Sequence, residues 1–244
     1  MTKIGKSAFV SCNDLKSITL NSMVKSIGKK AIGFDLESGN KYSKIDNVII
    51  YTPISSSNAA YKYAKKNGIT VVGITAKLKS IKLESSSVEY TGKAIKPSIT
   101  VKDSYGNTVK KKFYKVTFKN NKAVGKATII VEGKDPYTGT ISKTFKIVPK
   151  KTTLSSVNSK KSKQIVVKWK KNTSGSGYEI QYSSNKKFTS GTTKVVTISK
   201  NKTTSKTIKN LQSGKKYYVR VRSYKKVSGT KYYGAWSSVK IIEV

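Results

Sequence analysis

Ile4-Gly5-Lys6-Ser7-Ala8-Phe9 returns 23 residues later, with the same spacing, as Ile27-Gly28-Lys29-Lys30-Ala31-Ile32. Between the two copies, Leu15-Lys16-Ser17-Ile18-Thr19-Leu20 adds apolar residues at fixed offsets. A period in the twenties with Leu and Ile at fixed positions is typical of stacked repeats. One such unit cannot bury its apolar face, so neighbouring copies have to stack. The repeat therefore predicts a solenoid at the start of the chain.

The two copies resemble the BspA-like class of bacterial leucine-rich repeats, whose motif combines I-G-x-x-A-F, a small residue or Cys, and L-x-x-I-x-L. The resemblance covers residues 1–76. It implies that Cys12 is a buried core residue, that Val48-Ile49-Ile50 is a last strand, and that residues 33–44 form a looped-out insertion. Because the chain begins inside a repeat, we expect it to be the tail of a longer solenoid.

Residues 58–69 resemble the short helix that closes such arrays. Asn58 is a suitable N-cap, and Gly68 can end the helix. The residues expected to share its buried face are Ala60, Tyr63 and Ala64.

From Lys77 the pattern changes to short segments of period-two alternation between turn residues, which predicts a β-sandwich. The alternating positions are Ile99 and Val101; Tyr114, Val116 and Phe118; Ala127, Ile129 and Val131; Phe145 and Ile147. Several stretches resemble a bacterial immunoglobulin-like module. They are Tyr90-Thr91-Gly92, Lys96-Pro97, Asn120-Asn121-Lys122-Ala123-Val124-Gly125, Tyr137-Thr138-Gly139-Thr140 and Phe145-Lys146-Ile147. We assign this module to residues 77–149.

A Lys/Thr/Ser stretch from Lys150 is predicted to be a linker, and a second sandwich follows, so the third domain is residues 150–244. Its predicted core positions are Ile165, Val167 and Trp169 on one strand and Tyr178, Ile180 and Tyr182 on the next, with Glu179 and Gln181 facing outward. Trp169 and Leu211-Gln212-Ser213-Gly214-Lys215-Lys216-Tyr217 resemble the signature of a fibronectin type III domain. The resemblance implies a corner held by the Tyr217 hydroxyl and a last strand that begins at Trp236.

Fifty Lys and Arg residues face eleven Asp and Glu, which gives a formal net charge of +39. The only arginines are Arg220 and Arg222. Arg reads phosphates and bases in a bidentate way, whereas Lys is a hydrated point charge. We therefore expect no sequence-specific nucleic acid partner. The dispersed lysines predict either a solvated surface or non-specific attraction to polyanions such as teichoic acid or glycosaminoglycan.

The sequence offers little material for catalysis. It has no histidine, which excludes Ser-His-Asp and Cys-His catalysis and most zinc sites, and one cysteine, which excludes an internal disulfide. It has no glycine-rich phosphate loop or Asp-rich calcium loop, and its one close acidic pair, Asp35 and Glu37, is predicted to lie in a solvated loop. We expect no catalytic residue, metal or cofactor. No apolar run is long enough for a membrane span, and no apolar leader follows Met1.

One stretch stands out as a candidate binding site. Its residues are Tyr224, Lys225, Lys226, Lys231, Tyr232 and Tyr233. They surround a predicted loop before the last strand, and loops at the end of a sandwich often carry binding. Exposed Tyr beside Lys can stack on a sugar or hold an acidic partner. The alternative is that Tyr224 and Tyr232 only pair across a hairpin.

The resemblances together imply a mostly β chain: the end of a leucine-rich-repeat solenoid with a small capping helix, then an immunoglobulin-like and a fibronectin type III sandwich in line. They imply a non-catalytic adhesion, recognition and spacer segment of a bacterial cell-surface or secreted protein. We expect a monomer with an unidentified protein or glycan ligand, and a leader and anchor outside this chain. Two alternatives stay open: an accessory arm of a surface enzyme whose catalytic domain lies elsewhere, and a Lys-rich polyanion-binding module.

Overall fold

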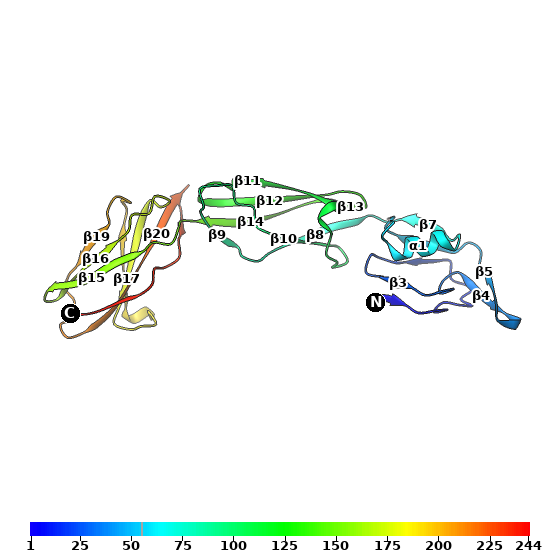
Figure 1. The fold of residues 1–244 in the computed structure, drawn as a ribbon, viewed down its shortest axis with the longest axis horizontal. Helices are drawn as coiled ribbons and strands as arrows, with labels where there is room; N and C mark the ends of the chain where they lie inside the picture. Colours follow the sequence, from blue (N-terminus) through cyan, green and yellow to red (C-terminus); the bar gives the residue numbers. More distant parts are fainter. Residues whose placement is uncertain (55) are drawn as a thin grey trace. The chain divides into compact units, whose positions relative to one another are not determined.

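A computed structural model describes residues 1–54 and 56–244, and its fold is mostly β (Figure 1). The contacts within the chain divide it into two compact units. Unit 1 comprises Met1–Leu83, Ser98–Thr117 and Ile130–Lys143, and unit 2 comprises Glu84–Pro97, Phe118–Ile129 and Thr144–Val244. Residues 77–149 contribute to both units, and the domain boundaries given above remain predictions.

The first 76 residues contain short parallel strands and one helix. Their elements are β1 (Lys3–Ile4), β2 (Ser17–Thr19), β3 (Ser26–Ile27), β4 (Phe34–Glu37), β5 (Lys41–Lys44), β6 (Ile49–Thr52), α1 (Ala59–Lys66) and β7 (Thr70–Gly73), with a 3₁₀ turn at Ser38–Asn40. β1 pairs in parallel with β3, and β2, β6 and β7 form a parallel sheet in that order. Ile4 lies opposite Ile27. The 23-residue echo in the sequence is therefore also a repeat in space.

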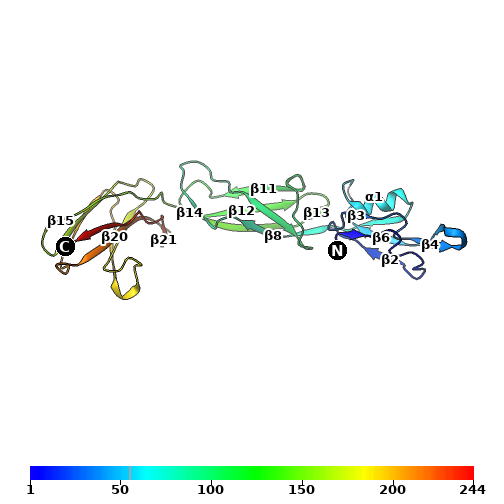
Figure 2. The same ribbon diagram turned by 60° about the horizontal axis from the view of Figure 1, so that its bottom comes forward.

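The helix forms as predicted. The Asn58 side chain caps α1 by accepting a 2.9 Å hydrogen bond from the backbone N–H of Tyr61. Ala60, Tyr63 and Ala64 are buried, and α1 packs against β3, β6 and β7, as Figure 2 shows for β6. The Tyr63 hydroxyl bonds the backbone of Ile32 at 2.9 Å. These two hydrogen bonds, one accepted and one donated, tie the helix to the segment between β3 and β4.

Two expectations for this region are wrong. Cys12 is exposed, because it lies in a turn between β1 and β2 and not at an inward strand position. Val48-Ile49-Ile50 does not supply the last strand, since β6 is followed by β7, which pairs with it. Residues 33–44, which were predicted to be a looped-out insertion, contain the antiparallel hairpin of β4 and β5.

Two sheets follow. The first has the order β10-β8-β13 and the second β11-β12-β14-β9. Their strands are β8 (Ala76–Leu83), β9 (Ser87–Glu89), β10 (Ile99–Asp103), β11 (Tyr114–Lys119), β12 (Gly125–Gly133), β13 (Tyr137–Thr138) and β14 (Thr140–Val148), with a 3₁₀ turn at Lys111–Phe113. Ala127, Ile129 and Val131 are fully buried in β12. The predicted alternation is confirmed for this strand.

The end of unit 2 is a β-sandwich. One sheet has the order β15-β16-β19, and the other β18-β17-β20-β21 with β22 also paired to β20. Their strands are β15 (Leu154–Lys161), β16 (Gln164–Trp169), β17 (Gly177–Ser183), β18 (Thr193–Ile198), β19 (Ser205–Ile208), β20 (Lys216–Val227), β21 (Thr230–Tyr233) and β22 (Lys240–Glu243), with a 3₁₀ turn at Ser190–Thr192. The last strand begins at Lys240, so the prediction that it begins at Trp236 is wrong.

The core of this sandwich lies between the two sheets and follows the predicted alternation. Trp169 is buried, and its ring contacts that of Tyr178 at 5.3 Å between centroids. The hydroxyl oxygen of Tyr217 accepts a 3.1 Å hydrogen bond from the backbone N–H of Gln212. This bond confirms the predicted corner.

Lys150 and the residues after it are not a free linker. Asn172 Nδ2 donates to the Lys150 carbonyl at 2.5 Å, the Ser223 hydroxyl donates to the same carbonyl at 3.0 Å, and the Lys150 N–H donates to Ser174 Oγ at 2.9 Å. Asn172 is itself buried. The polar composition of this stretch suggested a linker. The residues that bond to it lie far away in the sequence, so the stretch itself does not reveal them.

Candidate functional site

The predicted binding stretch is a β-hairpin and not an open loop. β20 and β21 pair in antiparallel fashion, with Tyr224 opposite Tyr233 and Lys225 opposite Tyr232. The predicted alternative of a hairpin is therefore confirmed. The expected partner of Tyr224 is wrong by one position, because Tyr224 lies opposite Tyr233 and not Tyr232. Directly opposite residues share a face of the sheet, so Tyr224 and Tyr233 lie on one face, and Lys225 and Tyr232 on the other.

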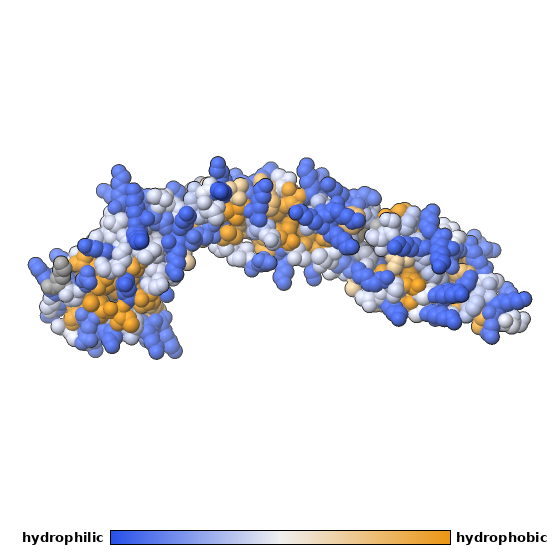
Figure 3. Space-filling model, in the orientation of Figure 1, coloured by the Kyte–Doolittle hydropathy of each residue, from blue (hydrophilic) through white to orange (hydrophobic). Residues whose placement is uncertain are grey.

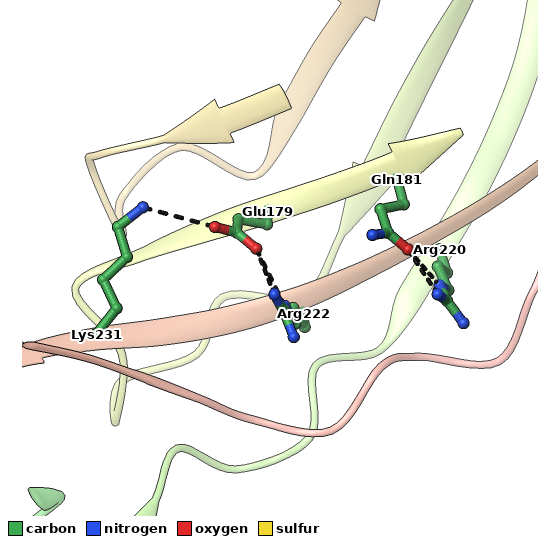
Figure 4. Close-up of polar contacts among 5 residues, drawn as sticks. All are labelled: Glu179, Gln181, Arg220, Arg222 and Lys231. Atoms are coloured by element: carbon green, nitrogen blue, oxygen red, sulfur yellow. Dashed lines mark hydrogen bonds and ion pairs between the residues drawn. The ribbon is translucent and has the colours of Figure 1, made fainter. Parts of the chain in front are cut away.

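Four polar side chains pair across β17 and β20 on the outer face of the five-stranded sheet. Nε and Nη2 of Arg222 donate to Oε2 of Glu179 at 3.1 and 2.7 Å, and Nζ of Lys231 lies 3.5 Å from Oε1 of the same carboxylate (Figure 4). One step along the strands, Nε and Nη2 of Arg220 donate to Oε1 of Gln181 at 2.8 and 2.6 Å. The outward orientation predicted for Glu179 and Gln181 is confirmed, yet Glu179 is buried beneath its partners.

Aromatic rings alternate with the two guanidinium groups. Cζ of Arg220 lies 3.9 Å from the ring centroid of Phe188 and 4.6 Å from that of Trp236. Cζ of Arg222 lies 4.3 Å from the centroid of Trp236 and 3.8 Å from that of Tyr233. A cation and the face of an aromatic ring attract each other electrostatically. We call Glu179, Gln181, Phe188, Arg220, Arg222, Tyr233 and Trp236 the arginine ladder.

The local structure explains the ladder. Arg220 and Arg222 are two residues apart on a strand, so both point to the same face. Phe188 reaches Arg220 from a turn in which its own φ is +53°, a left-handed conformation that is rare for a bulky residue. The sheet and the turn therefore hold the guanidinium groups in fixed positions.

The ladder also changes proton affinities. Burial lowers the pKa of Arg220, and the nearby charge of Arg222 lowers it further. Burial raises the pKa of Tyr233, and the charge of Glu179 acts in the same direction. Positive charge is thus held on Arg220 in a partly desolvated place next to a second cation.

The predicted site residues divide into two groups. Tyr233 belongs to the ladder, and Lys231 forms an ion pair with Glu179 of the ladder. Tyr224 is buried, with Lys231 Nζ 4.6 Å from its ring centroid. Lys225, Lys226 and Tyr232 lie outside the ladder. The residues that sequence reasoning missed as a site are Phe188, Glu179, Gln181, Arg220, Arg222 and Trp236. The sequence contained a usable signal for this site. Glu179 and Gln181 are two positions apart, as are Arg220 and Arg222, so each pair lies on one face of a strand.

Neither a metal centre nor a membrane-spanning helix occurs among the residues that the structure describes. No group of three or more His, Cys, Asp and Glu residues there could hold a metal ion. No helix in residues 1–54 and 56–244 has the length and apolar character needed to cross a membrane.

Comparison with known proteins identifies one part of the chain. Residues 149–239 match the family model of the fibronectin type III domain. Among curated proteins, none matches this chain. A solved structure described as a myokine is 17% identical, covers 39% of this chain and 96% of its own, and has a TM-score of 0.32.

Two further solved structures are similar. An FN3 domain of human collagen XX is 21% identical over 38% of this chain and 91% of its own, with a TM-score of 0.30. The FN1–FN3 domains of chicken CNTN1 are 17% identical over 71% of this chain and 69% of their own, with a TM-score of 0.34.

Proposed function

We propose that the chain is a non-catalytic recognition and spacer segment of a larger bacterial extracellular protein. Fibronectin type III domains are generally binding or spacer modules without catalytic activity, and residues 149–239 match that family. In this proposal residues 1–76 are the end of a leucine-rich-repeat solenoid, and the sandwiches carry it.

The observation that carries the proposal is the parallel register of the first strands. Ile4 lies opposite Ile27, the N–H of Gly28 donates to the carbonyl of Ile4 at 3.0 Å, and the N–H of Phe9 donates to that of Ala31 at 2.8 Å. Gly28 has a clear role here, because a Cβ at this position would collide with the backbone at Gly5 and Lys6. A repeat that bonds to its own copy in this way supports a solenoid.

The recognition surface proposed is the outward side of the β2-β6-β7 sheet. Thr19, Tyr51 and Val72 lie side by side in register, while Ile50 beneath them is fully buried. Thr19 and Val72 are exposed. A row of exposed side chains on parallel strands offers a regular surface to a protein or glycan ligand.

A binding screen tests this proposal. The whole chain is presented to arrays of extracellular proteins and glycans at physiological salt, alongside variants Thr19→Glu and Val72→Glu. Loss of the strongest ligand in both variants supports the proposal. The matched control is Thr100→Glu, which adds the same charge to an exposed position of β10. Equal loss in the control, or no ligand on either array, contradicts the proposal.

A second candidate, polyanion binding, is favoured by the net charge of +39. Hydrophilic side chains cover most of the surface drawn in Figure 3, with hydrophobic residues showing between them. Binding through dispersed lysines depends on counterion release, so it weakens steeply with salt. A salt titration of heparin binding separates the candidates: affinity for the array ligand persists at physiological salt, and affinity for heparin does not.

A further inference from the structure

The two arginines of the ladder differ in one respect. Arg222 has a carboxylate partner in Glu179, whereas the partner of Arg220 is the neutral amide of Gln181. Among the side chains that the structure describes, both ion pairs within 4.0 Å use Glu179. The charge of Arg220 is therefore held in place by Phe188 and Trp236 without being neutralised.

The environment of Arg220 is unfavourable for its charged form. Burial and the charge of Arg222 both act against its protonated form and lower its pKa. An anion placed on Arg220 from outside relieves that cost, since a charged acceptor makes stronger hydrogen bonds to a guanidinium than an amide does. A carboxylate is the planar anion that a guanidinium fork fits.

Two exposed aliphatic side chains lie on the same face as Arg220. Val195 of β18 is directly opposite Gln181 and is 51% exposed. Ile241 of β22 is opposite Tyr218, two residues before Arg220, and is 58% exposed. Adjacent strands lie about 4.8 Å apart, so Val195 is about 10 Å from Arg220 across the sheet. That span equals about three residues of an extended chain.

The aromatic rings argue against a sugar as the occupant. A sugar stacks on an open aromatic face, yet the rings of Phe188, Trp236 and Tyr233 already have guanidinium groups over them. The face also exposes aliphatic side chains, Val195 and Ile241, on both sides of the unneutralised cation. That combination suits a protein segment in which an acidic residue is flanked by aliphatic ones.

We propose that the outer face of the five-stranded sheet binds an acidic, aliphatic protein segment whose carboxylate bonds Arg220 and whose aliphatic side chains cover Val195 and Ile241. This inference rests on the proposed function and gives it a second recognition surface. The bound segment has Asp or Glu with an aliphatic residue two or three positions away on each side.

Selection from a phage library of random dodecapeptides on the whole chain tests this. The selection is done at roughly 0.15 M salt, where the Debye length is about 8 Å and dispersed lysines are screened. The decisive variant is Gln181→Glu, which supplies Arg220 with an internal carboxylate. Its control is Gln212→Glu, which adds the same charge at an exposed position outside the ladder. A denaturant melt of both variants confirms that each is folded.

The expected result is enrichment of peptides with an acidic residue between aliphatic ones. These peptides bind the Gln212→Glu chain like the original and the Gln181→Glu chain about tenfold more weakly or worse. No enrichment, or equal binding to both variants, overturns the inference. Selective loss of heparin binding in Gln181→Glu overturns it as well, because the occupant is then a glycan. None of these results bears on the β2-β6-β7 surface, which the Thr19 and Val72 variants test separately.

Discussion

Oε2 of Glu89 accepts a 2.9 Å hydrogen bond from the backbone N–H of Lys151. Glu89 ends β9, and Lys151 precedes the first strand of the last sandwich. The neighbouring Lys150 has both its N–H and its carbonyl bonded to Ser174, Asn172 and Ser223. Two successive residues predicted to be a linker thus have bonded backbones.

Glu89→Ala should release the Lys151 amide, because its acceptor is lost. We expect faster hydrogen exchange and a lower order parameter at Lys151, measured by NMR on the whole chain. Glu89→Gln keeps an acceptor oxygen and should retain most of the protection. Glu84→Ala serves as a control away from the bond. An unchanged Lys151 amide in Glu89→Ala would show that the bond does not order this segment.

Asn172→Ala should destabilise the last sandwich by about 3 kcal/mol, because the N–H and hydroxyl of buried Ser174 lose their acceptor and the Lys150 carbonyl loses one of its two donors. The chain has two tryptophans, Trp169 and Trp236, so their fluorescence during denaturation reports on this sandwich. Asn185→Ala, which removes a bond in an exposed turn, should cost much less. Equal costs for the two variants would rule out a special role for Asn172.

Tyr217→Phe should lower the free energy of unfolding of the same sandwich by about 1–3 kcal/mol, because the N–H of Gln212 loses its acceptor. Tryptophan fluorescence in urea is the measurement. Tyr232→Phe is the matched control, a tyrosine with no such corner bond. A midpoint that does not move in Tyr217→Phe would argue that water replaces the hydroxyl at no cost.

Gly177→Ala should destabilise by about 3 kcal/mol. Its Cβ would collide with the Ile198 carbonyl oxygen and come within 2.8 Å of the Tyr224 ring. Gly191→Ala, with nothing within 4 Å of its Cβ, should be nearly neutral. Thermal melts of the two variants give the comparison. Similar melting temperatures would contradict the close packing of Tyr224 against β17.

Asp35 should titrate below its usual range. A hydrogen bond with Ser11 lowers the pKa of this carboxyl most, and bonds from Asn13 and the Leu36 N–H add to the effect. A lowered pKa in the folded state means that the contribution to stability is present above the unfolded pKa and is lost as pH falls through the folded one. Ser11→Ala should raise the pKa, followed by carboxyl-carbon NMR, and Ser38→Ala should not. A titration unaffected by Ser11→Ala would refute this cause.

Sequence patterns predicted correctly those elements that depend on residues close together in the sequence. The Asn58 cap and the alternation of Ile165, Val167 and Trp169 depend on residues a few positions apart, and the structure confirms them. The repeat also indicated which residues lie opposite each other, because equivalent positions of two copies, such as Ile4 and Ile27, align when the copies stack.

The failures have different causes. Cys12 was placed inside because a motif gives a residue type and not its exposure. The pairing of Tyr224 depended on the turn at Ser228 and Gly229, where one position changes the partner. The arginine ladder joins β17, β20 and the turn at Phe188, segments whose meeting the alternation alone could not reveal.

The bonded entry to the last sandwich also has a mechanical meaning. The Lys150 carbonyl accepts a hydrogen bond from Ser223 of β20, and the N–H of Val244 donates to the Lys215 carbonyl just before β20 begins. Tension applied between Lys150 and Val244 therefore runs along β20. β22 is antiparallel to β20, and their hydrogen bonds lie perpendicular to the pull. We expect such bonds to share the force, so that stretching this sandwich breaks them together instead of opening one bond at a time.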